Sequence, residues 1–194
     1  MKEEFEALGA PPFEHRGTVA AEYLESFKEM WTSDTPHYDG TYTRVSNVTF
    51  LPKPVQKPHP PIWVGGESPP ALRRAGQHGD AWYPIGNNPR FPMDTADRLA
   101  TAMATVREHA ERAGRDPGGM DFAYSAGWYD DNAAQTGTDG NRRIFTGSPE
   151  QVVADIRQFE DLGVQHLIVG LQGASTDESI ERMERFAAEV RLLV

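Results

Sequence analysis

One stretch decides the fold: Pro61-Ile62-Trp63-Val64-Gly65-Gly66, followed closely by Ser68-Pro69-Pro70-Ala71-Leu72-Arg73-Arg74-Ala75-Gly76. Its first part is a short apolar run bounded by proline and glycine, which is typical of a buried strand. Its second part has the signals of a helix, because Ser68 suits the N-cap, Pro69 is tolerated in the first turn, and Gly76 can end the helix. The stretch therefore predicts a strand, a tight turn and a helix.

Three more strand–helix units follow along the chain. The second unit has a strand at 80–85 and a helix at about 94–113. The third has a strand at 121–129 and a helix at 148–162, and the fourth has a strand at 166–170 and a helix that begins near residue 176. The expected buried positions of this last helix are Ile180, Met183, Phe186, Ala187 and Val190.

The third helix has the clearest start in the chain, Ser148-Pro149-Glu150-Gln151. Serine followed three residues later by glutamine has the spacing of a capping box, and proline occupies the first helical position. The apolar face of this helix ends at Gly163, which can adopt the left-handed conformation of a helix C-terminus.

Alternation of short apolar runs with amphipathic helices is typical of an α/β fold with a parallel sheet. Four units are half of a TIM-barrel-like (β/α)8 fold, which takes about 250 residues in full. Half a barrel leaves two sheet edges with unpaired backbone groups. The pattern thus indicates either a fragment without its N-terminal strands or an open α/β sheet that covers its edges in another way.

Residues 1–60 precede the four units and have a different pattern. Residues 18–31 predict a helix, and 38–42 predict a hairpin in which Asp39-Gly40 supplies the positive φ of a tight turn. Prolines at five positions in 52–61 exclude a helix there and predict an extended connector. We expect a single domain over residues 1–194, made of this N-terminal segment and the four units at 61–194.

Composition excludes several classes of protein. The 194 residues include 19 Lys+Arg and 29 Asp+Glu, for a formal charge of −10, and no cysteine. Without cysteine there is no disulfide framework, thiolate metal site or cysteine nucleophile. The acidic balance argues against a nucleic-acid partner. No run is long and apolar enough for a membrane span, and the first residues lack a signal-peptide pattern, so we expect a cytoplasmic protein without membrane contact.

The best candidate site is Val64-Gly65-Gly66-Glu67-Ser68. Two glycines at the end of a buried strand allow a ligand to approach the backbone closely. The helix that follows would direct free N–H groups and the positive end of its dipole to the same place, as in a phosphate site. A plain strand-to-helix turn is the alternative, and Glu67 opposes a dianion if its side chain turns inward.

Other candidates carry weaker signals. The nucleotide, zinc-protease and α/β-hydrolase motifs are absent from the sequence, and the six histidines lack metal-ligand spacing, so we predict no metal site. A packing role is favoured for His166. Asp130-Asp131 would lie at the carboxyl end of a strand, where a solvated loop is the simpler interpretation and an active site is the alternative. Four aromatic residues near strands favour core packing over a wall for a flat ring system: Trp63, Trp82, Trp128 and Tyr129.

Several stretches resemble the luciferase-like monooxygenase family, especially its branch that uses the deazaflavin coenzyme F420. The most specific is the connector Pro52-Lys53-Pro54-Val55-Gln56-Lys57-Pro58-His59-Pro60-Pro61-Ile62-Trp63-Val64-Gly65-Gly66. Further matches are Glu4-Phe5-Glu6-Ala7-Leu8-Gly9, Gly40-Thr41-Tyr42, Ala71-Leu72-Arg73-Arg74-Ala75, Gly79-Asp80-Ala81-Trp82-Tyr83-Pro84 and Gly147-Ser148-Pro149-Glu150-Gln151-Val152. The resemblance extends over nearly the whole chain.

The resemblance implies a TIM-type barrel, here its C-terminal half, with a flavin or deazaflavin at the carboxyl ends of the strands and often a dimer. It places Val64, Gly65, Gly66, Glu67 and Ser68 in the segment that approaches the cofactor and its phosphate. The implied activity is an oxidoreductase that uses coenzyme F420 for hydride transfer on a small molecule. An FMN-dependent monooxygenase is the close alternative, and a truncated, non-catalytic half-barrel that binds a phosphorylated ligand or a partner chain is another. The residues that handle protons in the F420 branch lie on earlier strands, so we name no catalytic residue.

Overall fold

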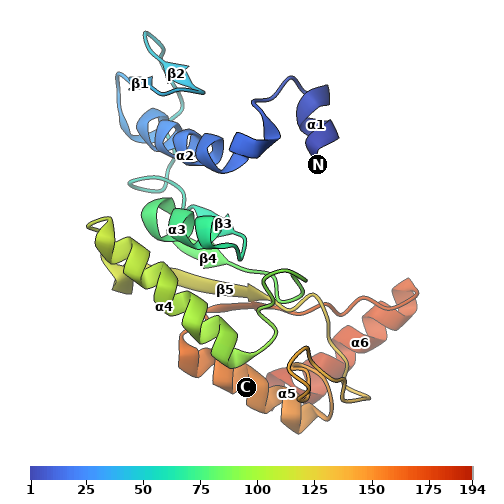
Figure 1. Ribbon diagram of the computed structural model, residues 1–194. Helices are drawn as coiled ribbons and strands as arrows, with labels where there is room; N and C mark the ends of the chain where they lie inside the picture. Colours follow the sequence, from blue (N-terminus) through green and yellow to red (C-terminus); the bar gives the residue numbers. More distant parts are fainter. Residues whose placement is uncertain (194) are drawn as a thin grey trace. The chain divides into compact units, whose positions relative to one another are not determined.

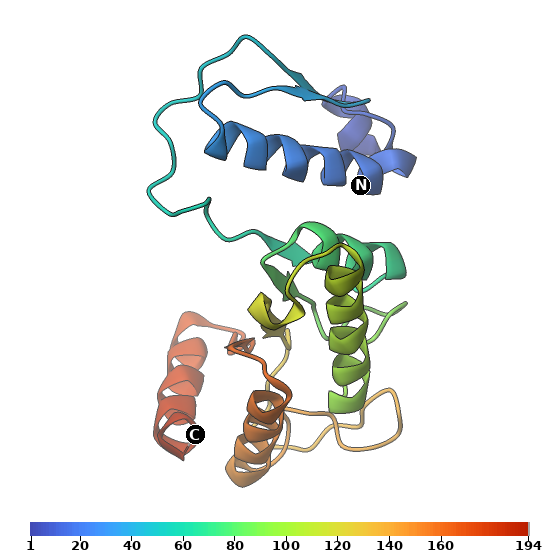
Figure 2. The same ribbon diagram turned by 90° about the vertical axis from the view of Figure 1, so that its left-hand side faces the viewer.

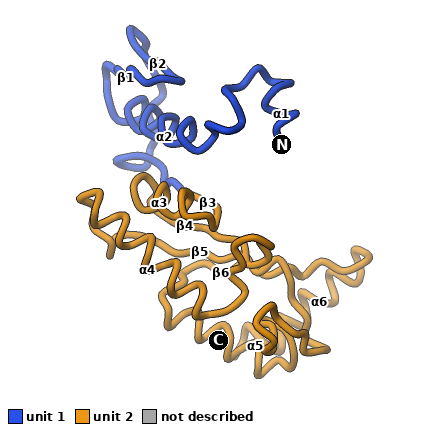
Figure 3. The backbone as a smooth tube through the Cα atoms, in the orientation of Figure 1, with its two compact units in different colours: residues 1–62 blue, residues 63–194 orange. Residues whose placement is uncertain are grey.

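The computed structural model describes residues 1–193. The chain forms two compact units, Met1–Ile62 and Trp63–Val194 (Figure 3). Their boundary falls two residues after position 60, where the sequence predicts the end of the N-terminal segment. None of the helices within the described residues is long and apolar enough to span a bilayer.

The first unit consists of a helix and a small hairpin with short flanking turns. Its elements are α1 (Lys2–Ala7), the 3₁₀ turn η1 (Phe13–His15), α2 (Arg16–Thr32), β1 (Tyr38–Asp39) and β2 (Arg44–Val45). The predicted helix at 18–31 is confirmed as part of α2. The connector at 52–61 contains no helix or strand, as its prolines predict. Lys53 donates from Nζ to the carbonyl oxygens of Met30 (2.7 Å) and Ser33 (2.5 Å), so its charge stabilises the carboxyl end of α2.

The hairpin turn differs from the prediction. Strands β1 and β2 pair Tyr38 with Val45 and Asp39 with Arg44, so the loop spans residues 40–43. The amide of Gly40 donates to the carbonyl of Thr43 at 2.9 Å, and Gly40 does not have a positive φ. A Cβ atom at Gly40 would collide with the Glu22 carboxylate. A side chain at this position would have to displace the ends of the Glu22 and Tyr38 side chains, and the expectation of a positive φ is wrong.

The second unit is a parallel sheet of four strands in the order β3-β4-β5-β6, with helices between them (Figure 1). Its strands are β3 (Trp63–Gly65), β4 (Ala81–Tyr83), β5 (Asp121–Ser125) and β6 (His166–Ile168). Its helices are α3 (Pro69–His78), α4 (Ala96–Arg112), α5 (Pro149–Leu162) and α6 (Thr176–Glu189), with 3₁₀ turns η2 (Pro117–Gly119) and η3 (Arg191–Leu193). Figure 2 shows α4, α5 and α6 in a curved row around the strands. All four predicted strand–helix units are present.

The sheet is strongly curved. The register pairs Trp63 with Ala81 in β4, and His166 of β6 with Ala123 in β5. Trp63 and His166 lie on opposite edge strands, three strand spacings or about 14 Å apart along a flat sheet. Their ring centroids are nevertheless 4.9 Å apart. The two large rings meet over the small side chains of Ala81 and Ala123, so the inner face is concave, as in half of an eight-stranded barrel.

Local sequence signals predict the ends of α5 correctly and the end of α3 wrongly. The capping box of α5 is present, with Ser148 and Gln151 bonded reciprocally, and Gly163 ends the helix with a φ of 93°. Gly76 lies inside α3, which continues to His78, so the predicted stop there is wrong. A Cβ atom at Gly76 would lie 2.5 Å from the carbonyl oxygen of Val106, so this glycine allows α3 and α4 to pack closely.

The structure also contradicts the predicted burial of one face of α6. Ile180 and Met183 are 45% and 48% exposed, although their spacing predicts burial. Phe186 and Val190 do pack against Tyr129, Val152 and Val153, in a cluster between α5 and α6. The apolar face of this helix therefore packs into a buried cluster at its carboxyl end and is nearly half exposed at Ile180 and Met183.

Candidate functional site

The carboxyl end of each strand in the sheet carries a glycine. These are Gly66 after β3, Gly86 after β4, Gly127 after β5 and Gly170 after β6. Gly66 and Gly127 have positive φ values of 100° and 68°. Carboxyl ends of parallel strands lie at one edge of the sheet, where loops that lack side chains allow a ligand to approach backbone atoms. Of these glycines, only Gly66 is part of the site predicted from the sequence, although the others also follow their predicted strands in the sequence.

The turn after β3 is built around Gly65 and Gly66. The left-handed conformation of Gly66 is one that other residues adopt at a cost, and a Cβ there would lie 2.9 Å from the Cβ of Ala71. A Cβ at Gly65 would make only an ordinary contact, 3.4 Å from the carbonyl oxygen of Tyr83. Val64 between Trp63 and Gly65 is buried. Gly65 thus leaves open space on the concave side, and Val64 anchors the strand in the core.

Glu67 connects the turn to the next loop. Its side chain is buried, with 5% of the residue exposed. Its two carboxylate oxygens accept hydrogen bonds from the amide of Ile85 (2.8 Å) and from Nδ2 of Asn88 (2.6 Å). Trp82 supports the same turn from below, because its indole Nε1 donates to the carbonyl oxygen of Gly66 at 2.9 Å. Both carboxylate oxygens therefore hold the β4–α4 loop against the glycine turn.

The start of α3 offers fewer hydrogen-bond donors than its sequence predicts. Pro69 and Pro70 have no N–H group, and the amides of Ala71 and Leu72 both donate to the carbonyl oxygen of Ser68, at 2.8 Å and 3.0 Å. The expectation of free helical N–H groups is therefore wrong. Within the described chain, the amides of Glu67 and Ser68 have no backbone acceptor, and the Ser68 hydroxyl makes no capping bond. These groups are the donors that remain for a ligand.

The four aromatic residues named from the sequence divide between core and surface. Trp82 is fully buried and Tyr129 is nearly so, which confirms packing for these two. Trp63 is 42% exposed on the concave face, with Tyr83 and His166 at ring-centroid distances of 5.9 Å and 4.9 Å. His166 is itself exposed and packs against Trp63. The concave face thus presents an aromatic surface of three rings.

Asp130 and Asp131 have structural partners. The Asp131 side chain is 4% exposed and accepts from Nε (2.5 Å) and Nη2 (3.0 Å) of Arg185 on α6. Asp130 accepts from the amide of Asn132 at 3.0 Å, and this bond and others lower the pKa of its carboxyl. The simple interpretation of two solvated carboxylates is therefore wrong for Asp131. A catalytic role for this pair loses its support, because these bonds occupy both carboxylates.

The neighbouring Tyr129 hydroxyl is the single buried side-chain polar atom in residues 1–193 without a hydrogen-bond partner. Burial raises the pKa of Tyr129. Within the same residues no group of three or more His, Asp or Glu side chains could hold a metal ion.

Comparison with known proteins gives three kinds of similarity. The sequence model of the luciferase-like monooxygenase family matches residues 1–135. The FMNH(2)-dependent dimethylsulfone monooxygenase of Pseudomonas putida is 34% identical over 116 residues, which are 59% of this chain and 32% of that protein. The uncharacterized protein Rv0953c of Mycobacterium tuberculosis is 27% identical over 186 residues, which are 96% of this chain and 55% of that protein. The chain thus spans about half or less of the length of these curated relatives.

Solved structures show the same fold at low identity. An F420-dependent secondary alcohol dehydrogenase, in complex with an F420-acetone adduct, superposes with a TM-score of 0.74 at 17% identity, over 98% of this chain and 66% of that one. The monooxygenase RslO1 from Streptomyces bottropensis superposes with a TM-score of 0.71 at 19% identity, over 98% of this chain and 65% of that one. These likenesses establish the barrel-type architecture of the chain.

Proposed function

The chain belongs to the luciferase-like monooxygenase family, and on this premise we propose that it binds a flavin or deazaflavin cofactor at the carboxyl edge of its sheet. Coenzyme F420 is the first candidate and FMN is the alternative. The proposed activity is an oxidoreductase that acts on a small molecule. Relatives and structural neighbours include enzymes described as F420-dependent and as FMNH(2)-dependent, so both cofactors are represented among them.

The observation that carries the proposal is the turn at Val64, Gly65, Gly66, Glu67 and Ser68. Gly65 leaves the backbone open on the concave side, and Gly66 turns the chain away from the strand. The free amides of Glu67 and Ser68 and the Ser68 hydroxyl are suited to a phosphate oxygen, because each can donate a hydrogen bond to an anion. Glu67 does not oppose this role with a free carboxylate, since both of its oxygens have donors.

The bound cofactor would supply the hydride or oxygen chemistry. The chain's own residues would position it: Gly65 would admit the group to van der Waals contact with backbone, and the Ser68 hydroxyl would orient a phosphate. Trp63 on the concave face would exclude water from one side of a planar ring. The carboxylates of Glu67, Asp130 and Asp131 are held by structural bonds, so we assign no acid or base to them.

The test is isothermal titration of the purified chain with oxidised coenzyme F420 and, separately, with FMN. Saturable binding of one of them is expected. Gly65→Ala should keep the fold, because its Cβ has room, and should weaken cofactor binding by about tenfold or more if the backbone approaches the ligand here. Ser68→Ala should weaken binding of the phosphorylated cofactor and not of riboflavin. A folded chain that binds neither cofactor would contradict the proposal.

A second candidate is a half-barrel that binds the phosphorylated ligand without turnover. The observation that favours it is the sheet itself, whose edge strands β3 and β6 have no further strand partner among the described residues. This candidate includes assembly with a second copy as a homo-oligomer, which would cover those edges. A single-turnover assay with reduced cofactor separates the two candidates, because only the enzyme would oxidise the cofactor in a substrate-dependent way.

A further inference from the structure

The loop from β5 to α5, residues 126–148, is held in place by three buried carboxylates. Asp94 accepts from the amide (3.2 Å) and the hydroxyl (2.7 Å) of Thr138. Asp155 of α5 accepts from Nη1 (2.9 Å) and Nη2 (2.5 Å) of Arg142, and from the amide of Phe145 at 2.7 Å. The third carboxylate is Asp131, bonded to Arg185 as described above. Long loops in compact domains are usually either functional or disordered, and these bonds hold this one in a defined conformation.

Backbone strain lies beside the bonds that Asp155 makes to this loop. Phe145 has a φ of 59°, which is uncommon for a residue with a side chain. Its ring is fully buried and packs against Phe159, with centroids 5.1 Å apart, and against Tyr124 at 6.1 Å. The packing and the bond to Asp155 offset the cost of this conformation. Strain that the surrounding structure maintains is common at binding sites.

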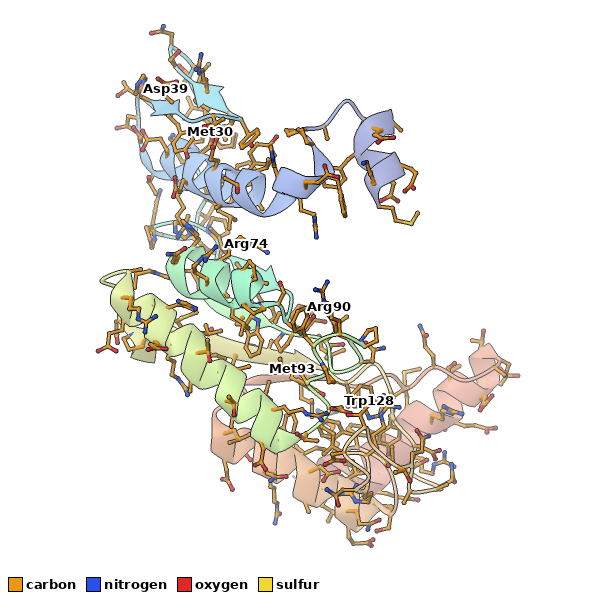
Figure 4. All side chains as sticks on the ribbon, in the orientation of Figure 1. Met30, Asp39, Arg74, Arg90, Met93 and Trp128 are labelled. Atoms are coloured by element: carbon orange, nitrogen blue, oxygen red, sulfur yellow. The ribbon has the colours of Figure 1, made fainter. Side chains whose placement is uncertain are left out.

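This rigid segment positions Arg143 on Trp128. The guanidinium carbon lies 3.7 Å from the centroid of the Trp128 ring. The indole is fixed in turn, because its Nε1 donates to the carbonyl oxygen of Ile144 at 2.8 Å. A Cβ on Gly86 would collide with the indole, so the β4–α4 loop also packs closely against the ring. Figure 4 shows Trp128 at the same end of the sheet as Arg90 and Met93, which belong to the segment after β4.

The guanidinium of Arg143 has no hydrogen-bond or ion-pair partner among residues 1–193, although the side chain is half-buried. Its neighbour Arg142 is fully engaged by Asp155 and the carbonyl of Thr146. The chain has 29 acidic residues against 19 basic residues. A shortage of carboxylates therefore does not explain why Arg143 has no ion-pair partner among the described residues. A partly desolvated guanidinium with a free planar fork is suited to bind an anion with two oxygens.

We infer that Arg143, held on Trp128, binds a phosphate or carboxylate group of a ligand at the carboxyl edge of the sheet. Trp128 follows β5 and the double-glycine turn follows β3, so the two sites lie at the same edge of the sheet with β4 between their strands. One ligand with two anionic groups can occupy both. That the ligand is a cofactor rests on the proposed function, and the presence of an anion site at Arg143 does not.

The test follows the Arg143 Nε–H signal in ¹H–¹⁵N spectra, assigned from its absence in Arg143→Gln, during titration with sodium phosphate or sodium acetate at constant ionic strength. A saturable shift with one of the two anions is expected, and the two titrations distinguish phosphate from carboxylate. Binding to the variants is followed at the indole Nε1–H signal of Trp128, which all of them keep. Arg143→Gln should weaken binding of that anion by about tenfold or more, and Arg143→Lys should weaken it less because it keeps the charge and loses the fork.

The matched control is Arg90→Gln. Arg90 is exposed near the same end of the sheet, with its guanidinium 5.4 Å from the Phe91 ring, and its removal should leave anion binding unchanged. Absence of a saturable shift at Arg143, or equal losses in the two variants, would overturn the inference. Failure of F420 and FMN to bind would count against the proposed function alone, because the anion titration is read at Arg143 without them.

Discussion

Gly65 and Gly66 are adjacent glycines with different physical requirements. Gly66 needs a left-handed backbone and has no room for a methyl group, whereas Gly65 has an ordinary backbone and sufficient space. Gly66 therefore serves the fold, and Gly65 is free to serve a ligand. Sequence alone shows a double glycine and cannot divide these roles, because the division depends on the position of Ala71 and of the carbonyl of Tyr83.

Gly66→Ala should lower the free energy of unfolding by about 2 kcal/mol, because it combines the cost of a positive φ with a contact to Ala71. Gly65→Ala is the control and should change it by less than about 1 kcal/mol. Urea denaturation monitored by circular dichroism measures both. Equal effects of the two substitutions would show that the turn is not built as described.

At the scale of elements, the end of a helix and the burial of its faces also depend on neighbouring segments, as α3 and α4 show. Periodicity and capping residues predict where a helix lies, and they succeed for α5, whose signals at Ser148 and Gly163 are local. They fail at Gly76, whose role is set by the backbone of α4, some thirty residues further along the chain. They also fail to predict the exposure of Ile180 and Met183, because helical spacing of apolar residues does not show whether another segment packs against that face.

Replacing glycine by alanine inside a helix usually stabilises a protein by about 1 kcal/mol. Gly76→Ala should instead destabilise this chain. The added methyl would lie 2.5 Å from the Val106 carbonyl oxygen, and the helices would have to separate, at a net cost of about 1–3 kcal/mol. Thermal and urea denaturation measure the sign. Gln77→Ala at the next, exposed position of α3 should be neutral or slightly stabilising. A more stable Gly76→Ala variant would mean that α3 and α4 do not pack this closely.

Asp94 connects two loops and gives a pH dependence. Burial disfavours its charged form, but hydrogen bonds from Thr138 and Arg98 outweigh burial, and the pKa of Asp94 lies below its ordinary value. With a depressed folded-state pKa, the ionised carboxylate stabilises fully above the unfolded-state pKa of about 3.9. This stabilisation is lost as the pH falls through the folded-state pKa.

Asp94→Asn should therefore cost about 2 kcal/mol at pH 7, and its difference from the wild type should shrink below about pH 4. Denaturation midpoints across this range measure the difference. Asp97→Asn, on the exposed side of the first turn of α4, is the control and should change stability by about 0.5 kcal/mol or less at either pH. A constant difference between Asp94→Asn and the wild type would contradict the depressed pKa.

On the scale of the whole molecule, the alternation of strands and helices was sufficient to predict a half-barrel, because each unit carries its own signals. The single domain over residues 1–194 stays a prediction. The site was harder to predict, since the donors at Ser68 and the unpaired Arg143 depend on which groups the fold leaves without partners. A sequence lists the donors and acceptors and does not show how they pair.

Helix α6 exposes two apolar side chains, Ile180 and Met183, that a second copy of the chain could cover. We expect the chain to form a dimer in solution that buries the exposed apolar face of α6. Ile180→Lys combined with Met183→Lys should shift the mass measured by light scattering from twice 21.5 kDa towards 21.5 kDa, with an unchanged circular dichroism spectrum. Glu181→Lys is the charge control on the same helix and should leave the mass unchanged. A wild-type chain that is monomeric at micromolar concentration would contradict the expectation.

The contact between Trp63 and His166 makes the curvature of the sheet observable in solution. The two rings belong to strands at opposite edges, and they touch only because the sheet bends over Ala81 and Ala123. A protonated imidazole quenches indole emission on contact, so under acidic conditions in which the chain stays folded a flattened sheet would separate the pair and brighten Trp63. The emission difference between the wild type and His166→Ala thus reports whether an event in this protein, such as ligand uptake or assembly, opens or closes the barrel wall.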